Sequence, residues 1–269
     1  MDSIKHLVDL ARNEGAMMEL AIPNNHIAQV DERIPPWQTV FELADSLTCD
    51  SWILIGGLMV QLYGSMFSVE TRSTRDIDLL INVLAQRESF SSIVHKIEKV
   101  GFNPNPPTFR NGSFYRLSRE DAAIDVFVAD HLPRTCRTTF GSGKWRLAET
   151  PGGAQAISRS VFIDLQSQNR SAQIRIPSIL GAIIMKSAVV SPTDPLSEKH
   201  LSDIALLASL MEKPVEQRCL LHGSDLRRIK RAARILENPN HPAWLSLPDA
   251  RRQCGYMNLR ILSSPEFHN

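Results

Sequence analysis

Residues 51–82, SWILIGGLMVQLYGSMFSVETRSTRDIDLLIN, decide the fold. The apolar run Trp52–Ile55 predicts a strand, and Gly56-Gly57 predicts a tight turn after it. The amphipathic residues that follow predict a helix. After a polar loop, Asp76–Ile81 predicts a second strand. The stretch therefore predicts a strand, a glycine turn, a helix, a loop and a strand, in that order.

Two carboxylates enter the second of these strands. Residues i and i+2 of a strand point to the same face, about 6.5–7 Å apart along the chain, so Asp76 and Asp78 project together. Ile77 and Leu79 then face a core. Paired carboxylates are costly to remove from water, and a divalent cation with oxygen ligands offsets that cost. We expect Mg²⁺ here, because it is the usual cation where phosphates supply the remaining ligands.

The glycine turn adds a second signal. Glycines before a helix let backbone N–H groups approach a phosphate at the positive end of the helix dipole. Alone, a glycine pair is usually only a turn, and an Asp-x-Asp pair is often a solvated strand end. Together, and with Thr74 between them, they are more specific. We therefore expect Gly56, Gly57 and Thr74 to bind nucleotide phosphates.

A further carboxylate lies in the apolar run Ala122–Ala129, which predicts a strand interrupted by Asp125. A charge within such a strand is rarely fully buried unless it is paired. One interpretation is a partly exposed aspartate on an edge strand. The other is a third metal ligand, which could also take the proton from an acceptor hydroxyl. Asp121 and Asp130, at the strand ends, are weaker candidates.

The glycine pair and the pattern Arg72-x-Thr74-x-Asp76-x-Asp78 resemble the signature of the DNA polymerase β-type nucleotidyltransferase superfamily. The closer resemblance is to the AbiEii-like branch, which includes toxins of bacterial toxin–antitoxin pairs. It covers residues 38–210 in rough outline. The resemblance implies a metal site of three acids, in which Asp125 takes the third place on a following strand, and one or two Mg²⁺ ions.

The same resemblance implies a lysine on one helix and a charged cluster on the next, both directed at the nucleotide. Lys186 matches the first, on a helix that Pro177 is expected to start. Lys199 and Asp203 match the second, on a helix predicted over Ser197–Met211. Lys186 would offset negative charge on the triphosphate or the leaving pyrophosphate. The alternatives are a lysine that snorkels outward near a helix C-terminus, and an exposed i,i+4 ion pair between Lys199 and Asp203.

Basic residues outnumber acidic ones near the C-terminus, in residues 218–260, while acidic residues outnumber basic ones in residues 1–50. A predicted amphipathic helix from Asp225 carries four bases on one face at i, i+3, i+4 and i+7. They are Arg227, Lys230, Arg231 and Arg234. Such a face can bind RNA phosphates, or it can simply be solvated.

Composition sets broad limits. The chain has 269 residues, 43% of them hydrophobic and 22% charged, with a formal net charge of +1. No apolar run reaches the roughly 18–20 residues of a membrane span, so no membrane partner is expected. The N-terminus lacks the apolar segment of a secretory signal. The four cysteines are scattered without metal-ligand spacing, which favours reduced thiols in the cytoplasm.

These patterns predict an α/β (α+β) fold. A nucleotidyltransferase domain, residues 1–176, would place a small mixed sheet among helices, including an N-terminal helix over residues 2–13. A helical C-terminal domain, residues 177–269, would follow.

The expected activity is Mg²⁺-dependent transfer of a nucleotide from an NTP to an acceptor hydroxyl. The resemblance implies the 3′ end of tRNA as acceptor and a toxin with a cognate antitoxin protein as partner. One alternative is a small-molecule acceptor, as in antibiotic-resistance enzymes. Another is a non-catalytic module that senses nucleotides or binds an antitoxin. Three acids kept together argue against that module, because a pure binder does not need them.

Overall fold

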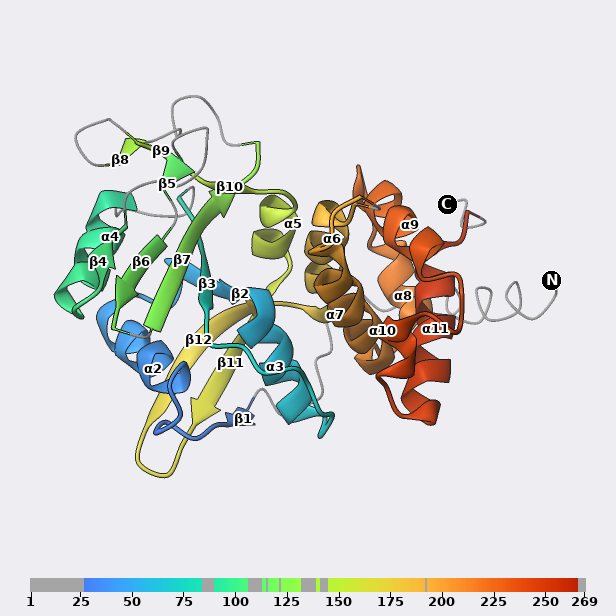
Figure 1. Ribbon diagram of the computed structural model, residues 1–269, viewed down its shortest axis with the longest axis horizontal. Coiled ribbons are helices and arrows are strands. Elements are labelled where there is room, and N and C mark those ends of the chain that lie inside the picture. Colours follow the sequence, from blue (N-terminus) through green and yellow to red (C-terminus); the bar gives the residue numbers. More distant parts are fainter. Residues whose placement is uncertain are drawn as a thin grey trace. The chain divides into compact units, whose positions relative to one another are not determined.

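The computed structural model describes most of the chain in two compact units, one spanning Asn25–Gly181 and the other containing Ala182–Asn269 (Figure 1). The described residues are 27–83, 90–105, 113–114, 116–120, 122–131, 139–140, 145–191 and 193–265. The boundary between the units lies shortly after the predicted one at residue 177. The helix predicted over residues 2–13 lies outside the described residues, as does Asp121.

In the described part of the first unit, the largest sheet has six strands in the order β2-β3-β7-β6-β4, with β10 paired to β7. These strands are β2 (Trp52–Ile55), β3 (Ile77–Ile81), β4 (Asn103–Pro104), β6 (Arg116–Arg119), β7 (Ala122–Ala129) and β10 (Glu149–Thr150). β3 runs antiparallel to β2 and parallel to β7, and β6 runs antiparallel to β7. The sheet is therefore mixed, which confirms the predicted α/β fold class.

Apolar runs form β2, at one end of this sheet, and its neighbour β3. All four residues of β2 are buried, and in β3 only Asp78 is not. Three helices accompany the sheet: α2 (Trp37–Ser46), α3 (Gly56–Met66) and α4 (Phe90–Lys99). In α4 the buried positions recur at helical spacing, which confirms the predicted apolar stripe of Phe90, Ile93, Val94 and Ile97.

Two smaller sheets complete the first unit. One has the order β1-β11-β12, and the other has the order β5-β9-β8. Their strands are β1 (Ile27–Gln29), β5 (Ser113–Phe114), β8 (Thr139–Phe140), β9 (Trp145–Leu147), β11 (Ser160–Gln166) and β12 (Ser171–Pro177), and the short helix α5 (Gly153–Ser158) precedes β11. The side chain of Tyr63 ties helix α3 to the end of β12, because its hydroxyl donates to the Pro177 carbonyl at 2.7 Å.

The prediction that Pro177 starts a helix is wrong by two residues. Pro177 is the last residue of β12, where it pairs with Ser160, and α6 (Ile179–Val189) begins at Ile179. Ser178 acts as the N-cap of α6, since its hydroxyl accepts a hydrogen bond from the Gly181 N–H at 3.2 Å.

The second unit is helical, as predicted. After α6 it contains α7 (Ser197–Leu210), α8 (Pro214–Cys219), α9 (Asp225–Ile235), α10 (Pro242–Leu245) and α11 (Asp249–Ser263). α7 lies at its centre and packs against α10 and α11. Gly255 permits a close approach, because a Cβ there would lie 2.9 Å from the Trp244 ring and 3.0 Å from the Ser209 nitrogen. The Asn258 amide donates to the carbonyls of Ala208 and Met211, both at 2.9 Å.

Among the residues that the structure describes, no helix has both the length and the apolar character needed to cross a membrane.

The Tyr63 hydrogen bond generates a stability prediction. Tyr63 is fully buried, and burial raises its pKa, so the hydroxyl stays protonated and donates at ordinary pH. Tyr63→Phe should lower the free energy of unfolding by about 1–3 kcal/mol, because the Pro177 carbonyl loses its buried donor. Urea denaturation followed by circular dichroism measures this. Tyr256→Phe is the control, because the Tyr256 hydroxyl donates to Glu237 at an exposed site where water can replace it. Equal stability of the two variants would contradict the prediction.

Candidate active site

A carboxylate from β3 lies at the start of α3, which follows β2 directly, so the two predicted turn glycines are the first residues of the helix. α3 begins at Gly56, whose φ of +74° is rarely adopted by L side chains. A Cβ at Gly56 would also overlap the carboxylate of Asp78, which extends from β3 opposite Ile55. The backbone conformation and the contact with Asp78 therefore each require glycine at this position. The Asp78 carboxylate lies where the α3 dipole favours an anion.

The second glycine makes room for the loop before β3. A Cβ at Gly57 would lie 3.1 Å from the Arg72 guanidinium and 3.3 Å from the Thr74 side chain. The loop therefore lies against the first turn of α3. Gly56, Gly57 and Thr74, all predicted to bind phosphates, thus come together around the helix N-terminus. Arg72 joins them, although the sequence pattern gave it no role.

Asp76 is exposed and lies one residue before β3, while Asp78 within the strand is half-buried. Ile77 and Leu79 are almost fully buried, which agrees with the predicted alternation. The two aspartates differ in setting: Asp76 is at the surface, and Asp78 is held against Gly56.

Asp125 lies in β7, which is flanked by β3 on one side and β6 on the other, so it is not on an edge strand. It is the direct register partner of Asp78 in the parallel β3–β7 pair. Register partners leave the same face of a sheet, and neighbouring strands lie about 4.8 Å apart. Asp78 and Asp125 therefore come from adjacent positions on one face. Asp130, by contrast, accepts backbone hydrogen bonds from Gly152 and Ala154 beyond the end of β7.

The sequence did not reveal the partner of Asp125. Arg116 of β6 is its register partner on the other side and donates to both carboxylate oxygens, from Nε at 2.6 Å and from Nη2 at 2.8 Å. The Asp125 side chain is only 10% exposed, so this bidentate pair compensates a buried charge. The sequence showed an arginine shortly before β7, but it did not show how β6 and β7 align, so the Arg116–Asp125 pair could not be predicted.

The donor atoms fit Mg²⁺ only in part. Asp76 and Asp78 offer carboxylate oxygens of the kind that Mg²⁺ prefers. Both oxygens of Asp125 accept a hydrogen bond from Arg116, so a metal at Asp125 would compete with the guanidinium. In the described ranges, no three His, Cys, Asp or Glu side chains gather closely enough to hold a metal ion.

Lys186 and Asp203 form a buried ion pair between α6 and α7 in the second unit. Lys186 Nζ lies 2.7 Å from Asp203 Oδ2, and the two side chains are 5% and 3% exposed. Neither structural alternative from the sequence is correct. Lys186 does not snorkel outward, and Asp203 pairs with Lys186 rather than with Lys199, which is exposed. The proposed role of these residues at a nucleotide stays a prediction.

The predicted basic face lies on α9. Arg227, Arg231 and Arg234 are exposed and Lys230 is half-buried, while Ile229 lies on the buried side. These bases are not equivalent. Arg231 donates to the Ala188 carbonyl in the last turn of α6 at 3.3 Å, so it also caps a helix.

A pocket of about 1050 Å³ opens beside the loop that precedes β3. Thr74 and Arg75 line it, together with Trp37 of α2 and Gln61 of α3. Its size suits a nucleotide or a similar ligand. Thr74 is the one predicted site residue on its wall, so the pocket adjoins the aspartates without including them.

Comparison of the chain with protein-family models, with curated proteins and with solved structures found no match.

The Lys186–Asp203 pair gives the prediction for this site. Lys186→Ala should cost about 3–5 kcal/mol of unfolding free energy, because it removes the ammonium that compensates the buried Asp203 carboxylate. The double variant Lys186→Met, Asp203→Leu should recover most of that loss, because it removes both charges and keeps the volume. Denaturant titration of the wild type and both variants measures this. A single variant as stable as the wild type would show that the pair does not support the fold.

Proposed function

We propose that this protein is a Mg²⁺-dependent nucleotidyltransferase that transfers a nucleotide from an NTP to an acceptor hydroxyl. The observation that carries the proposal is the close approach of the Asp78 carboxylate to Gly56 at the start of α3. It brings a carboxylate, a type of group that can bind Mg²⁺, next to a helix N-terminus, a type of site that can bind phosphate. Asp125, the register partner of Asp78, adds a second carboxylate on the same face.

Each group around the turn has a defined task in this proposal. The first backbone N–H groups of α3, at Gly56 and Gly57, donate to triphosphate oxygens, and the Thr74 hydroxyl adds a further donor. The Arg72 guanidinium, beside Gly57, balances phosphate charge. Asp76 and Asp78 would hold Mg²⁺, which would neutralise the charge that develops on the leaving pyrophosphate.

Asp125 has two possible states in this scheme. Paired with Arg116, its charge is compensated, and it serves to orient the guanidinium on the same face as Asp78. Released from Arg116, it becomes the third ligand and a base close to the acceptor hydroxyl. The proposed enzyme uses the second state, and Arg116 then turns to the phosphates.

The acceptor that we propose is the 3′ end of tRNA, in the manner of a toxin with a cognate antitoxin, acting in the cytoplasm. Two features support it: the resemblance of the glycine and aspartate motifs to AbiEii-like toxins, and the basic face of α9 in the second unit. The thiols of Cys49, Cys219 and Cys254 are free, as suits a reducing compartment.

The Arg116–Asp125 pair favours a second candidate function. A nucleotide-sensing module would keep a phosphate-binding turn and would use Asp125 only to orient Arg116. The presence of three acids was an argument against a non-catalytic module. That argument is weaker because one of the three, Asp125, accepts hydrogen bonds from Arg116 on both oxygens. In this candidate, NTP binds and no transfer occurs.

Labelled NTPs, Mg²⁺ and total RNA test the main proposal. The wild type should label tRNA, and Asp78→Asn should abolish labelling because it removes a charged ligand without changing the side-chain volume. Asp50→Asn is the matched control, because Asp50 is a surface carboxylate whose side chain is 71% exposed. Labelling that survives in Asp78→Asn would sink the assignment. A labelled small product would point to the resistance-type enzyme, and binding without product to the sensing module.

Mn²⁺ binding, followed by electron paramagnetic resonance, tests the two states of Asp125. If Asp125 becomes a ligand, Arg116→Gln should tighten Mn²⁺ binding by about tenfold or more, because a charge-assisted competitor is gone. Asp125→Asn should weaken it. If neither variant changes the affinity, Asp125 is not a ligand, and the sensing module becomes the better candidate.

A further inference from the structure

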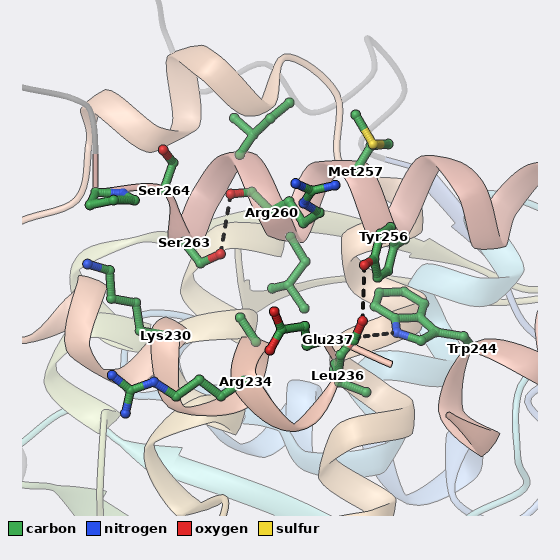
Figure 2. Close-up of a pocket in the computed structure, with 14 residues that line it drawn as sticks. Lys230, Arg234, Leu236, Glu237, Trp244, Tyr256, Met257, Arg260, Ser263 and Ser264 are labelled. Atoms are coloured by element: carbon green, nitrogen blue, oxygen red, sulfur yellow. Dashed lines mark hydrogen bonds between the residues drawn. The ribbon is translucent and has the colours of Figure 1, made fainter. Parts of the chain in front are cut away.

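A pocket of about 800 Å³ lies within the second unit, between the end of α9, α10 and α11 (Figure 2). Its size is in the range of sites that enclose small ligands or single residues of a polymer. It involves none of the aspartates or glycines of the candidate active site. Two of the bases predicted to bind RNA, Lys230 and Arg234, line it.

The inner wall of this pocket is aromatic and rigid. The rings of Trp244 and Tyr256 meet edge to face, with centroids 5.9 Å apart. Their polar atoms already have partners: Trp244 Nε1 donates to the Leu236 carbonyl at 2.9 Å, and the Tyr256 hydroxyl donates to the Glu237 carbonyl at 3.0 Å (Figure 2). Trp244 is fully buried and packs against Tyr256, so the half-buried Tyr256 ring is the aromatic surface that the wall offers to a ligand. Met257, 51% exposed, extends this surface to the mouth.

The charges around the pocket are mostly positive. Lys230 and Arg234 come from α9 and Arg260 from α11, and Glu237 is the one acidic residue among the described residues that line the pocket. The Arg260 guanidinium lies 5.9 Å from the centre of the Tyr256 ring. A ligand that complements this site has a flat apolar group and phosphates on either side of it. An unpaired base between two phosphates fits this ligand description. A membrane, which presents a flat charged surface, does not.

We propose that this pocket binds an unpaired base of single-stranded RNA, with Lys230, Arg234 and Arg260 contacting the flanking phosphates. Aromatic and apolar side chains that take bases, set in a positively charged groove, are the general means of holding single strands. The site goes beyond the proposed transfer reaction, because it needs neither NTP nor metal. It also changes which residues are expected to contact RNA. Arg260 is added to them, and Arg231 is removed because it donates a hydrogen bond at the end of α6.

The affinity for fluorescein-labelled oligouridylate, measured by anisotropy in EDTA and without NTP, tests the phosphate contacts. Arg260→Gln should flatten the slope of log K against log salt by about 0.7, the value of one phosphate contact on a single strand. Lys213→Gln removes one exposed charge elsewhere in the same unit and should leave the slope unchanged. If Arg227→Gln flattens the slope and Arg260→Gln does not, the outer face of α9 binds the RNA and the pocket does not.

An abasic strand of the same length tests the base contact. It should bind about 5- to 100-fold more weakly than oligouridylate, the range of one to a few kcal/mol expected for stacking one base. Met257→Glu, at the mouth, should remove most of that preference, whereas Gln253→Glu on the exposed side of α11 should not. Equal binding of the abasic strand, or of inorganic polyphosphate, would overturn the proposal, because the pocket would then recognise charge alone. Since no metal or NTP is present, this result is independent of whether transfer occurs.

Discussion

The close approach of Asp78 to Gly56 is the constraint on which the first unit depends. It needs a backbone with positive φ, a position without Cβ and a carboxylate that faces the start of α3. Once these are met, the chain can leave β2 directly into a helix, and the loop before β3 can close over Gly57. The candidate site is therefore a consequence of how β2, α3 and β3 are joined.

Much of this arrangement could be predicted from local patterns. The apolar run of β2, the alternation in β3 and the helical stripe of α4 each depend on residues close in sequence, and the structure has them where the patterns place them. Asp125 could be placed within a buried strand for the same reason. What the patterns could not supply was the order of the strands, because pairing joins segments that are distant in the chain.

The partners of the charged residues show that limit most clearly. Arg116 reaches Asp125 only because β6 and β7 pair in one register, and Lys186 reaches Asp203 only because α6 packs on α7. Local spacing suggested Lys199 for Asp203, but burial decides the outcome: a lysine enclosed at the α6–α7 contact must have a counter-charge there, whereas an exposed one does not. The pocket beside Trp244 was equally hidden, since its walls come from three helices.

The pairing of Asp78 with Asp125 across β3 and β7 also restricts which strand alignments are open to the chain. A shift of one residue in either strand would exchange its two faces. The aspartate would then enter the apolar layer, and a neighbouring leucine or valine would take the position of the carboxylate. At the other positions of these strands a shift would only exchange one apolar residue for another, because the remaining residues are apolar on both faces of the sheet. The two carboxylates thus favour the native register over a shifted one, at the same positions that form the candidate site.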